Sequence, residues 1–447
     1  MRSWQVFLTL LMAVISVAGT FIVVRAAALI TATKADVLLV DADSSGAASP
    51  GDTLEYTVII TNSGADAATG LKYDDNIDSN TTLVPGSLTH SPIAVDDLYP
   101  ETILGNVSVD SALISYGVIA NDNLGNPAGT ITAYDATTAQ GGQVSMVTSG
   151  TDMGKFTYNP PPGFEGTDTF TYTVTNTTGS MVATVSMPIA KMVWFINNTA
   201  SSCTTLAAGC GRLSNPFSTL AAFQALNDGT GNNPASNDIV FIYESASPYP
   251  DPLTLLSGQL VIGQDATASL ATIGSLTPAP SSTVLPATDS ANGVVVNVTG
   301  TVTLNTNVIV RGLQINSTTN TGLADPAGSI SGVTVADMSI ATTTGTPVLL
   351  SNTGGSFTIK SISANGAANG ISLTNTTGSF TVDGDGVDVT VGGNNSGGVI
   401  QNITGADGAT AGNGIYLSNA QNVSLRRMRL SGNSNFAISG ATVNGFV

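Results

Sequence analysis

The sequence predicts an all-β chain, in which two β-sandwich modules are followed by a right-handed parallel β-helix. Charged residues make up 9% of the 447 residues and Gly contributes 49, a composition that disfavours long charged helices. Hydrophobic residues at 42% also disfavour a disordered chain. Apolar and polar residues alternate at period two before residue 190, and strand-like runs recur at a fixed longer period after it.

The N-terminus is typical of an export signal. Arg2 precedes an uncharged apolar run over residues 6–24, and three alanines follow at 26–28. A basic start, an apolar stretch and small residues form the pattern of a secretory signal peptide, here residues 1–28. The run is also long enough to cross a bilayer as an uncleaved anchor, and the sequence leaves both readings open. Either reading places the rest of the chain outside the cytoplasm, in an extracellular or cell-surface location.

The charge of the chain is strongly negative and unevenly spread. Twelve Lys and Arg oppose thirty Asp and Glu, which gives a net charge of -18. With 18 acids and 3 bases, residues 29–189 alone carry -15. Nucleic acid is therefore excluded as a partner, because phosphate binding requires clustered basic side chains. We expect the acidic front half to attract cations instead.

The first module, residues 33–92, contains one well-defined strand. Residues 53–60 alternate in polarity as a strand with one buried face does, and turn residues stand on both sides, PGD before and NSG after. The run PGDTLEYTVIITNSG, from Pro50 to Gly64, resembles the domain-of-unknown-function-11 family. The resemblance implies a β-sandwich of the kind repeated on bacterial surface proteins, and no defined chemistry.

The second module, residues 93–189, has strands with aromatic core faces. The residues that fall at period two are Phe156, Tyr158, Phe170, Tyr172 and Val174. The module carries DD near its start (IAVDDLYP), ND in its middle (YGVIANDNLGN) and G-x-D-x-F-x-Y near its end (EGTDTFTY). This pattern resembles the bacterial cadherin-like or Ig-like tandem module. It implies a seven-stranded sandwich used as a spacer.

Acidic and amide side chains at the ends of the second module suggest a metal. Cadherin-like modules commonly bind calcium at such junctions, and calcium prefers hard oxygen ligands. The resemblance therefore implies calcium as a cofactor, with the candidate ligands Asp96, Asp97, Asn121, Asp122 and Asp168. The alternative is that these residues only form Asx-turns and solvate loops.

The remaining chain, residues 190–447, has the pattern of a solenoid. Strand-like runs lie 25, 24, 23 and 43 residues apart, starting at Val308, Val333, Phe357, Phe380 and Val423. A second series, 44 and 23 residues apart, starts at Ile371, Ile415 and Ile438. A period in the twenties with Asn-Gly corners indicates stacked coils. A sandwich stays open as an alternative, although it does not explain two phased series.

The start of this region combines strands with a helix. The runs MVWFIN, DIVFIYES and LVIGQDA read as strands. A helix is predicted within residues 215–229, with Ser218 as its N-cap and an apolar face made of Leu220, Phe223 and Leu226. This order resembles the N-terminal cap and first coils of bacterial right-handed parallel β-helix proteins of the pectate-lyase-like class.

The two cysteines of the chain, Cys203 and Cys210, lie close together in sequence. An oxidising compartment outside the cytoplasm favours a local disulfide between them. The alternative is a pair of free thiols. The spacing suits zinc poorly, because no His is nearby.

Many proteins of the pectate-lyase-like class cleave acidic polysaccharides, so catalysis has to be weighed. The run VDGDGVDV can hold a cation through Asp383, Asp385 and Asp388, but a turn between strands is the stronger interpretation. The densest basic patch either meets an anionic glycan or only covers a polar surface, and consists of Arg426, Arg427 and Arg429. The sequence assigns no catalytic residue.

Two functions are therefore compatible with the sequence. The first is a secreted or cell-surface structural and adhesive protein, whose sandwich modules are spacers and whose β-helix contacts glycans or other cell-surface components. The second is a polysaccharide-active enzyme, a lyase or glycoside hydrolase on the β-helix. The scarcity of titratable groups favours the first. Because the last coil lacks a capping element, the sequence also predicts a truncated β-helix, with further coils and an attachment segment after Val447. Membrane contact is expected only through the leader or such an anchor.

Overall fold

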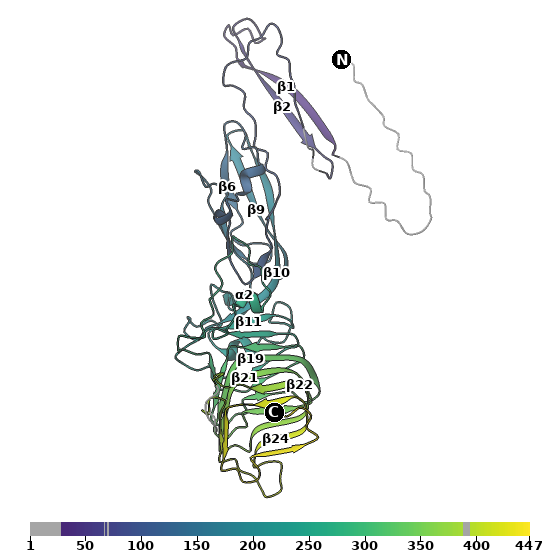
Figure 1. Ribbon diagram of the computed structural model, residues 1–447. Helices are drawn as coiled ribbons and strands as arrows, with labels where there is room; N and C mark the ends of the chain where they lie inside the picture. The colour runs from purple at the N-terminus through teal and green to yellow at the C-terminus, as the bar shows by residue number, and fades with distance from the viewer. Residues whose placement is uncertain (1–27, 67, 69–70, 388–393) are drawn as a thin grey trace, which may run out of the picture. The chain divides into compact units, whose positions relative to one another are not determined.

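The computed structural model shows an all-β chain, as the sequence predicts (Figure 1). It describes residues 28–66, 68, 71–387 and 394–447. The chain divides into two compact units, of which the first ends at Ser87 and the second runs from Leu88 to Val447. The predicted signal peptide lies outside the described residues except for Ala28. None of the described helices is long and apolar enough to cross a membrane.

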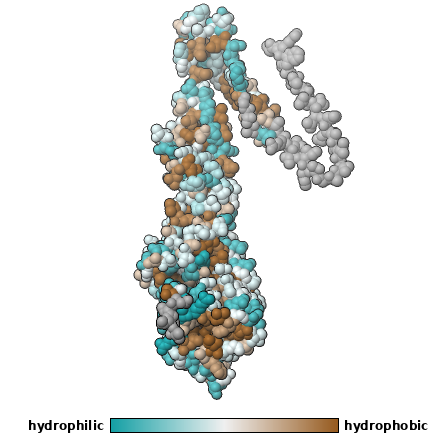
Figure 2. Space-filling view, viewed as in Figure 1, coloured by the Kyte–Doolittle hydropathy of each residue, from teal (hydrophilic) through white to brown (hydrophobic). Residues whose placement is uncertain are grey.

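The first unit contains one antiparallel hairpin. Strand β1 (Ile30–Val40) pairs with β2 (Thr53–Asn62), so the strand predicted from residue 53 is present. Its expected buried face is only partly covered, since Tyr56 and Ile60 are 47% and 39% exposed while Leu54 and Val58 are half-buried. Apolar side chains of this unit reach the molecular surface (Figure 2). The complete β-sandwich of residues 33–92 therefore stays a prediction.

The second unit begins with two small antiparallel sheets around an aromatic core. The first sheet contains β6 (Thr130–Tyr134), β9 (Gly166–Asn176) and β10 (Gly179–Ile196), with β3 (Asp97–Leu98) and β4 (Ile103–Gly105) in parallel on β10. The second contains β5 (Val109–Asp110), β8 (Phe156–Asn159) and β7 (Gln143–Met146). The predicted core residues Phe156, Tyr158, Phe170, Tyr172 and Val174 are all buried. Period-two placement thus identified the inward face correctly.

Strand β10 continues from these sheets into the next region. Its first part pairs with β9, and its last four residues, Val193 to Ile196, pair in parallel with β11 (Ile239–Ile242). Lys191 has a φ of 64° at the bulge between the two parts. Leu104 and Val107 lie in one buried cluster with Val193 and Phe195. The predicted boundary between residues 189 and 190 therefore falls inside a strand and beside a shared core.

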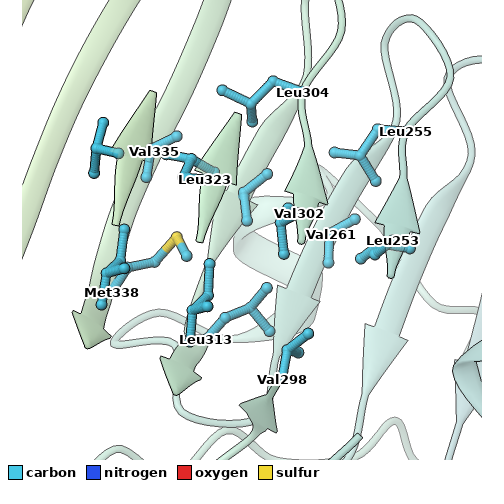
Figure 3. Close-up of a cluster of buried hydrophobic side chains, with 14 of the residues drawn as sticks. Leu253, Leu255, Val261, Val298, Val302, Leu304, Leu313, Leu323, Val335 and Met338 are labelled. Atoms are coloured by element: carbon cyan, nitrogen blue, oxygen red, sulfur yellow. The ribbon is translucent and has the colours of Figure 1, made fainter. Parts of the chain in front are cut away.

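From β11 onward, parallel strands stack coil upon coil. The strands of this region, called the coil region below, are β12 (Leu253–Thr254), β13 (Leu260–Gly263), β14 (Asn297–Val298), β15 (Val302–Thr303), β16 (Ile309–Arg311), β17 (Gln314–Ser317), β18 (Leu323–Ala324), β19 (Ile330–Thr342), β20 (Val348–Ser351), β21 (Thr353–Asn365), β22 (Asn369–Val382), β23 (Gly398–Gln401), β24 (Asn413–Ala420), β25 (Val423–Leu425), β26 (Met428–Ser431) and β27 (Ile438–Ala441). Their inward Val, Ile, Leu and Met side chains fill a continuous core (Figure 3). Stacking buries the apolar faces of neighbouring coils against one another, which a single coil cannot do alone.

The register of the coils agrees with the predicted period at most positions. Ile371 pairs with Ile415, which pairs with Ile438, so the second predicted series is in register. The 44 residues from Ile371 to Ile415 nevertheless form one long coil, which exceeds the predicted period in the twenties. Phe357 pairs with Phe380, and their rings lie 5.8 Å apart. The prediction is two residues out for Val333, which pairs with Gly355. Irregular pairing along β19, where Gly332 has a φ of 71°, shifts the register.

The helices are short. They are η1 (Ser111–Ile114), η2 (Val118–Asn121), η3 (Leu206–Ala208), α1 (Leu220–Gln224) and α2 (Leu270–Ile273). The predicted helix is α1, with Leu220 and Phe223 buried, but Ser218 is not its N-cap. Thr219 caps it, accepting a hydrogen bond from the Ala222 amide at 3.1 Å. The Ser218 hydroxyl instead bonds to the backbone of Cys203.

Candidate metal centre

Three carboxylates meet in the turn between β1 and β2. Oxygen atoms of Asp41, Asp43 and Asp52 all lie within 4.8 Å of one another. Within the described part of the chain, this is the group of three or more His, Cys, Asp or Glu side chains that can share a metal ion. No residue of this cluster was among the predicted ligands.

Short backbone hydrogen bonds hold these carboxylates in place. Asp41 accepts from the amides of Ser45 and Gly46, at 3.1 and 2.7 Å. Asp52 closes the loop by accepting from the amides of Ala42 and Ser49, at 2.7 and 2.6 Å. Gly46 has a φ of 76°, which glycine adopts without strain.

Asp43 completes the group and remains anionic. Its carboxylate accepts from the Ser45 amide and the Ser49 hydroxyl, both at 3.0 Å. Hydrogen bonds from Ser45 and Ser49 lower the pKa of Asp43 below its ordinary value. Hard anionic oxygens in a tight turn are the ligands that calcium takes in proteins.

The spacing of these residues is the signal that sequence reasoning missed. Residues 41–52 read DADSSGAASPGD, which is D-x-D-x-S-G-x5-D. The calcium loop of an EF-hand has oxygen ligands at positions 1, 3, 5 and 12 and Gly at position 6. This loop departs from that pattern through Ser45 at position 5 and Asp52 at position 12. Two strands flank it in place of helices.

Of the predicted ligands, the structure brings Asp97 and Asp122 together. A carboxylate oxygen of each lies within hydrogen-bond distance of the Tyr172 hydroxyl oxygen, at 3.1 and 2.9 Å, so the two acids share its single hydrogen. Asp96 lies beside them in sequence but accepts from the Thr184 amide at 2.8 Å. The side-chain amide of Asn121 donates long hydrogen bonds, both 3.4 Å, to the backbone carbonyls of Val95 and Asp96.

The Asp97–Asp122 pair is electrostatically strained. The pKa of Asp97 is raised to about 6, mainly by burial and to a lesser degree by the nearby Asp122 and Asp96 carboxylates, against hydrogen bonds from Tyr172 and Tyr116 that lower it. Burial also raises the pKa of Asp122. A bound cation would relieve both effects, because opposite charge favours the ionised carboxylate.

Asp168 has different partners from these residues. It is fully buried and accepts from the hydroxyls of Thr138 and Tyr158 and from the amides of Gln140 and Thr169. Its oxygens are therefore satisfied by the protein itself. A calcium-binding role for Asp168 stays a prediction.

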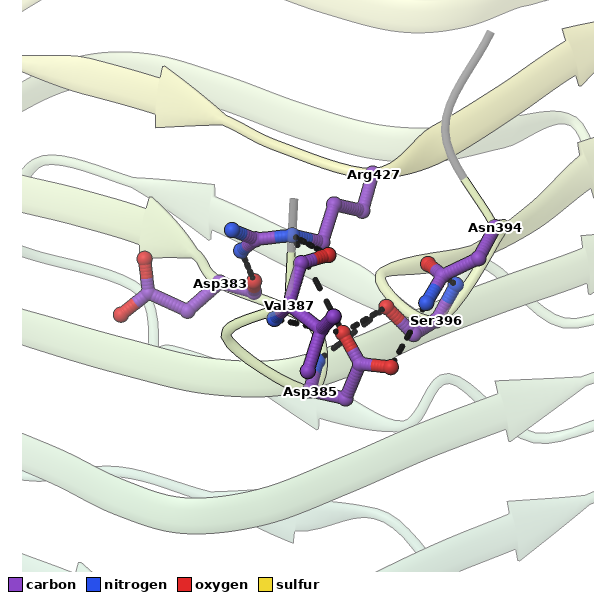
Figure 4. A network of polar contacts seen from close by, with 6 residues as sticks. All are labelled: Asp383, Asp385, Val387, Asn394, Ser396 and Arg427. Atoms are coloured by element: carbon purple, nitrogen blue, oxygen red, sulfur yellow. Dashed lines mark hydrogen bonds and ion pairs between the residues drawn. The ribbon is translucent and has the colours of Figure 1, made fainter. Parts of the chain in front are cut away.

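The aspartates of the VDGDGVDV run belong to a loop clamp (Figure 4). Asp385 accepts from Val387, Asn394 and Ser396 at 2.6 to 3.0 Å. Arg427 donates to the backbone carbonyls of Val387 and Asp383. The Asp385 carboxylate thus holds the turn, whereas Asp383 contributes only its backbone carbonyl, and Asp388 lies outside the described residues. Cation binding by this run stays a prediction. Of the predicted basic patch, Arg426 and Arg429 are exposed.

A disulfide joins Cys203 and Cys210, whose Cα atoms are 5.4 Å apart. It closes a loop that contains η3 and lies just before α1. The loop stands where the coil region begins, beside the buried Trp194 and Phe217. The disulfide is therefore placed to fix this first coil.

Comparison with known proteins identifies one segment. Residues 89–187 match the family model of the bacterial Ig domain. Neither the curated proteins nor the solved structures give a match. The matched segment coincides with the two sheets around Phe156 and Phe170. Residues 89–187 are thus a bacterial Ig-like domain within an all-β chain.

Proposed function

We propose that this chain is an exported structural and adhesive protein of the bacterial cell surface. The Ig-like domain is its spacer, and the coil region is a right-handed parallel β-helix whose long polar faces contact glycans or other surface components. The observation that carries this proposal is the shared strand β10, which builds the spacer and the coils into one compact unit. A continuous strand of this kind suits an Ig-like spacer that holds the coil region away from the cell surface.

The outer face of the coils supports a contact role. Asn375 donates to Asn352 at 2.9 Å, and Asn419 donates to Asn375 at 3.0 Å. These exposed amides form a ladder along the stack, with a rise of about 4.8 Å per coil. Ordered amides and hydroxyls at a fixed repeat offer many weak hydrogen bonds to a chain of sugars.

Calcium is the cofactor of the acidic front half. The Asp41–Asp52 loop supplies carboxylate and hydroxyl oxygens with EF-hand spacing, and Asp97 with Asp122 supplies a second, smaller acidic pair. The ion would neutralise repulsion in a segment that carries -15 over residues 29–189. Spacer domains that are stiffened in this way hold their shape outside the cell.

Two measurements on the full chain test the proposal. Protease treatment of intact cells should degrade the protein if it is exposed at the surface, and a cytoplasmic control protein should stay intact. The purified chain should bind a subset of a panel of acidic and neutral glycans without releasing products. A protein that is protected inside the cell overturns the location, and release of oligosaccharides would establish the enzyme alternative instead.

A further inference from the structure

A cleft of about 450 Å³ lies where the Ig-like domain meets the first coil. The Ig-like domain contributes Gln140, Gln143 and Pro162 to its walls. The coil region contributes Ala208, Arg212 and Asn232. Both walls belong to the same compact unit, so their relative position is fixed by β10 and by the shared core.

Arg212 is held in this cleft by neutral partners. Its Nε donates to the Gly209 carbonyl at 3.0 Å and its Nη1 to the Pro160 carbonyl at 3.2 Å. No ion pair of Arg212 with a carboxylate occurs among the described residues. Burial lowers the pKa of Arg212 from its ordinary value. A partly buried guanidinium without an anion is costly, and its free N–H groups remain available.

This arrangement is unusual for so acidic a chain. With thirty Asp and Glu against twelve Lys and Arg, a carboxylate partner for Arg212 would be easy to supply. Two neutral carbonyls, one on each wall, orient the guanidinium instead. Guanidinium and carboxylate form strong paired hydrogen bonds, so an external carboxylate is the ligand that completes this site.

The wall that carries Arg212 is prebuilt. The helix η3 (Leu206–Ala208) lies inside the loop closed by the Cys203–Cys210 disulfide. Gly209 follows with a φ of 78°, and a Cβ atom at this position would collide with the Arg212 guanidinium. The disulfide therefore constrains the loop, and the absence of a side chain at Gly209 leaves space for the Arg212 guanidinium at the cleft.

We propose that this cleft binds the acidic sugar unit of a glycan, with Arg212 pairing with a uronate carboxylate. The exposed amides of Gln140, Gln143 and Asn232 then hydrogen-bond sugar hydroxyls, and the ring of Pro162 covers a C–H face. Amides in this number suit a polyhydroxylated ligand better than a peptide end, which needs an apolar side-chain pocket. The inference deepens the proposed function, because it names a ligand class for the surface protein.

The test uses the full chain and trigalacturonate as probe, with neutral galactotriose and a short peptide with a free C-terminal carboxylate as comparisons. Ala208 is exposed on the cleft wall, so A208E places a competing carboxylate near Arg212 and A208Q is its neutral match. Titration calorimetry should show trigalacturonate affinity reduced at least about tenfold by A208E and changed less than about threefold by A208Q. R212Q should reduce it as A208E does, and thermal melting checks that each variant is folded.

The outcomes separate this inference from the proposed function. Equal affinity of the wild-type chain and A208E for trigalacturonate overturns the cleft assignment and leaves surface adhesion standing. Binding of galactotriose or of the peptide in preference to trigalacturonate overturns the ligand class. Absence of trigalacturonate binding by a chain that binds another glycan overturns the inference alone.

Discussion

At the residue scale, two carboxylates of the Ig-like domain, Asp168 and Asp97, differ in burial and in their hydrogen-bond partners. Asp168 is fully buried and accepts four hydrogen bonds from the protein. Asp97 is only partly buried, and this burial is the largest cause that raises its pKa to about 6. Burial, with a smaller contribution from the neighbouring Asp122 and Asp96, therefore makes Asp97 a group that titrates near pH 6.

The Ig-like domain should lose stability as the pH rises through the titration of Asp97. The folded-state pKa of about 6 lies above the ordinary value of 3.8. The folded protein therefore binds more protons than the unfolded chain in that window, and the stabilisation present below about pH 4 is lost by about pH 6. Asp97→Asn should flatten this dependence and raise the melting temperature at pH 7 by a few degrees, roughly 1–4 °C.

Melting curves of the full chain from pH 4 to pH 7 measure the effect. Asp152→Asn is the matched control, because Asp152 is an exposed acid of the same domain that pairs with Lys155 at 2.6 Å. A D97N profile parallel to that of the wild type would show that Asp97 keeps its ordinary pKa.

At the element scale, the turn between β1 and β2 should bind calcium. Asp52→Asn removes a charge from the position that closes the loop, so calcium affinity should fall at least about tenfold from a wild-type Kd on the order of 0.1–1 mM. Calorimetric titration of the full chain with calcium measures this. Asp36→Asn, an exposed acid on β1 outside the loop, should leave the affinity unchanged, and an equal loss in both variants would mean only diffuse charge attraction.

Periodicity predicted the elements better than it predicted their connections. The phase of Ile371, Ile415 and Ile438 is visible in the sequence because each coil, whatever its length, returns to the stack with an Asn-Gly or Asn-Phe-Ala step directly before the Ile. The two-residue shift at Val333 is not visible, since Val333 and Val335 lie on the same buried face and either can be matched to Phe357 by pattern. The cap of α1 was misplaced by one residue because Ser218 and Thr219 have equal capping chemistry, and only the contact with Cys203 decides between them.

The candidate sites were harder to predict than the strands. The three carboxylates of the β1–β2 turn have a readable spacing, which the more conspicuous DD and ND pairs of the next module obscured. The cleft at Arg212 has no sequence signal. Gln140 and Arg212 line the same cleft only because β10 carries the chain from one sheet into the next.

At the scale of the second unit, the Ig-like domain and the first coils should unfold together. Strand β10 is eighteen residues long and contributes to both regions. The buried cluster that the two regions share places Leu104 with Phe195. A loop–loop contact adds to this, since Ser108 Oγ lies 2.8 Å from Thr283 Oγ1. Inserting four glycines between Ala190 and Lys191 should uncouple the regions, because it interrupts the strand at its existing bulge.

Differential scanning calorimetry of the full chain distinguishes coupled from independent unfolding. In the wild type, the heat absorbed by these two regions should fall in one transition, and the insertion should split it into two. The same four glycines placed between Thr230 and Gly231, in an exposed loop of the first coil, should leave one transition, because no shared strand is cut there. Separate transitions in the wild type would mean that the interface between the regions contributes little free energy. The spacer would then act as a hinge, since a continuous strand transmits stiffness only while the core on both sides of it stays packed.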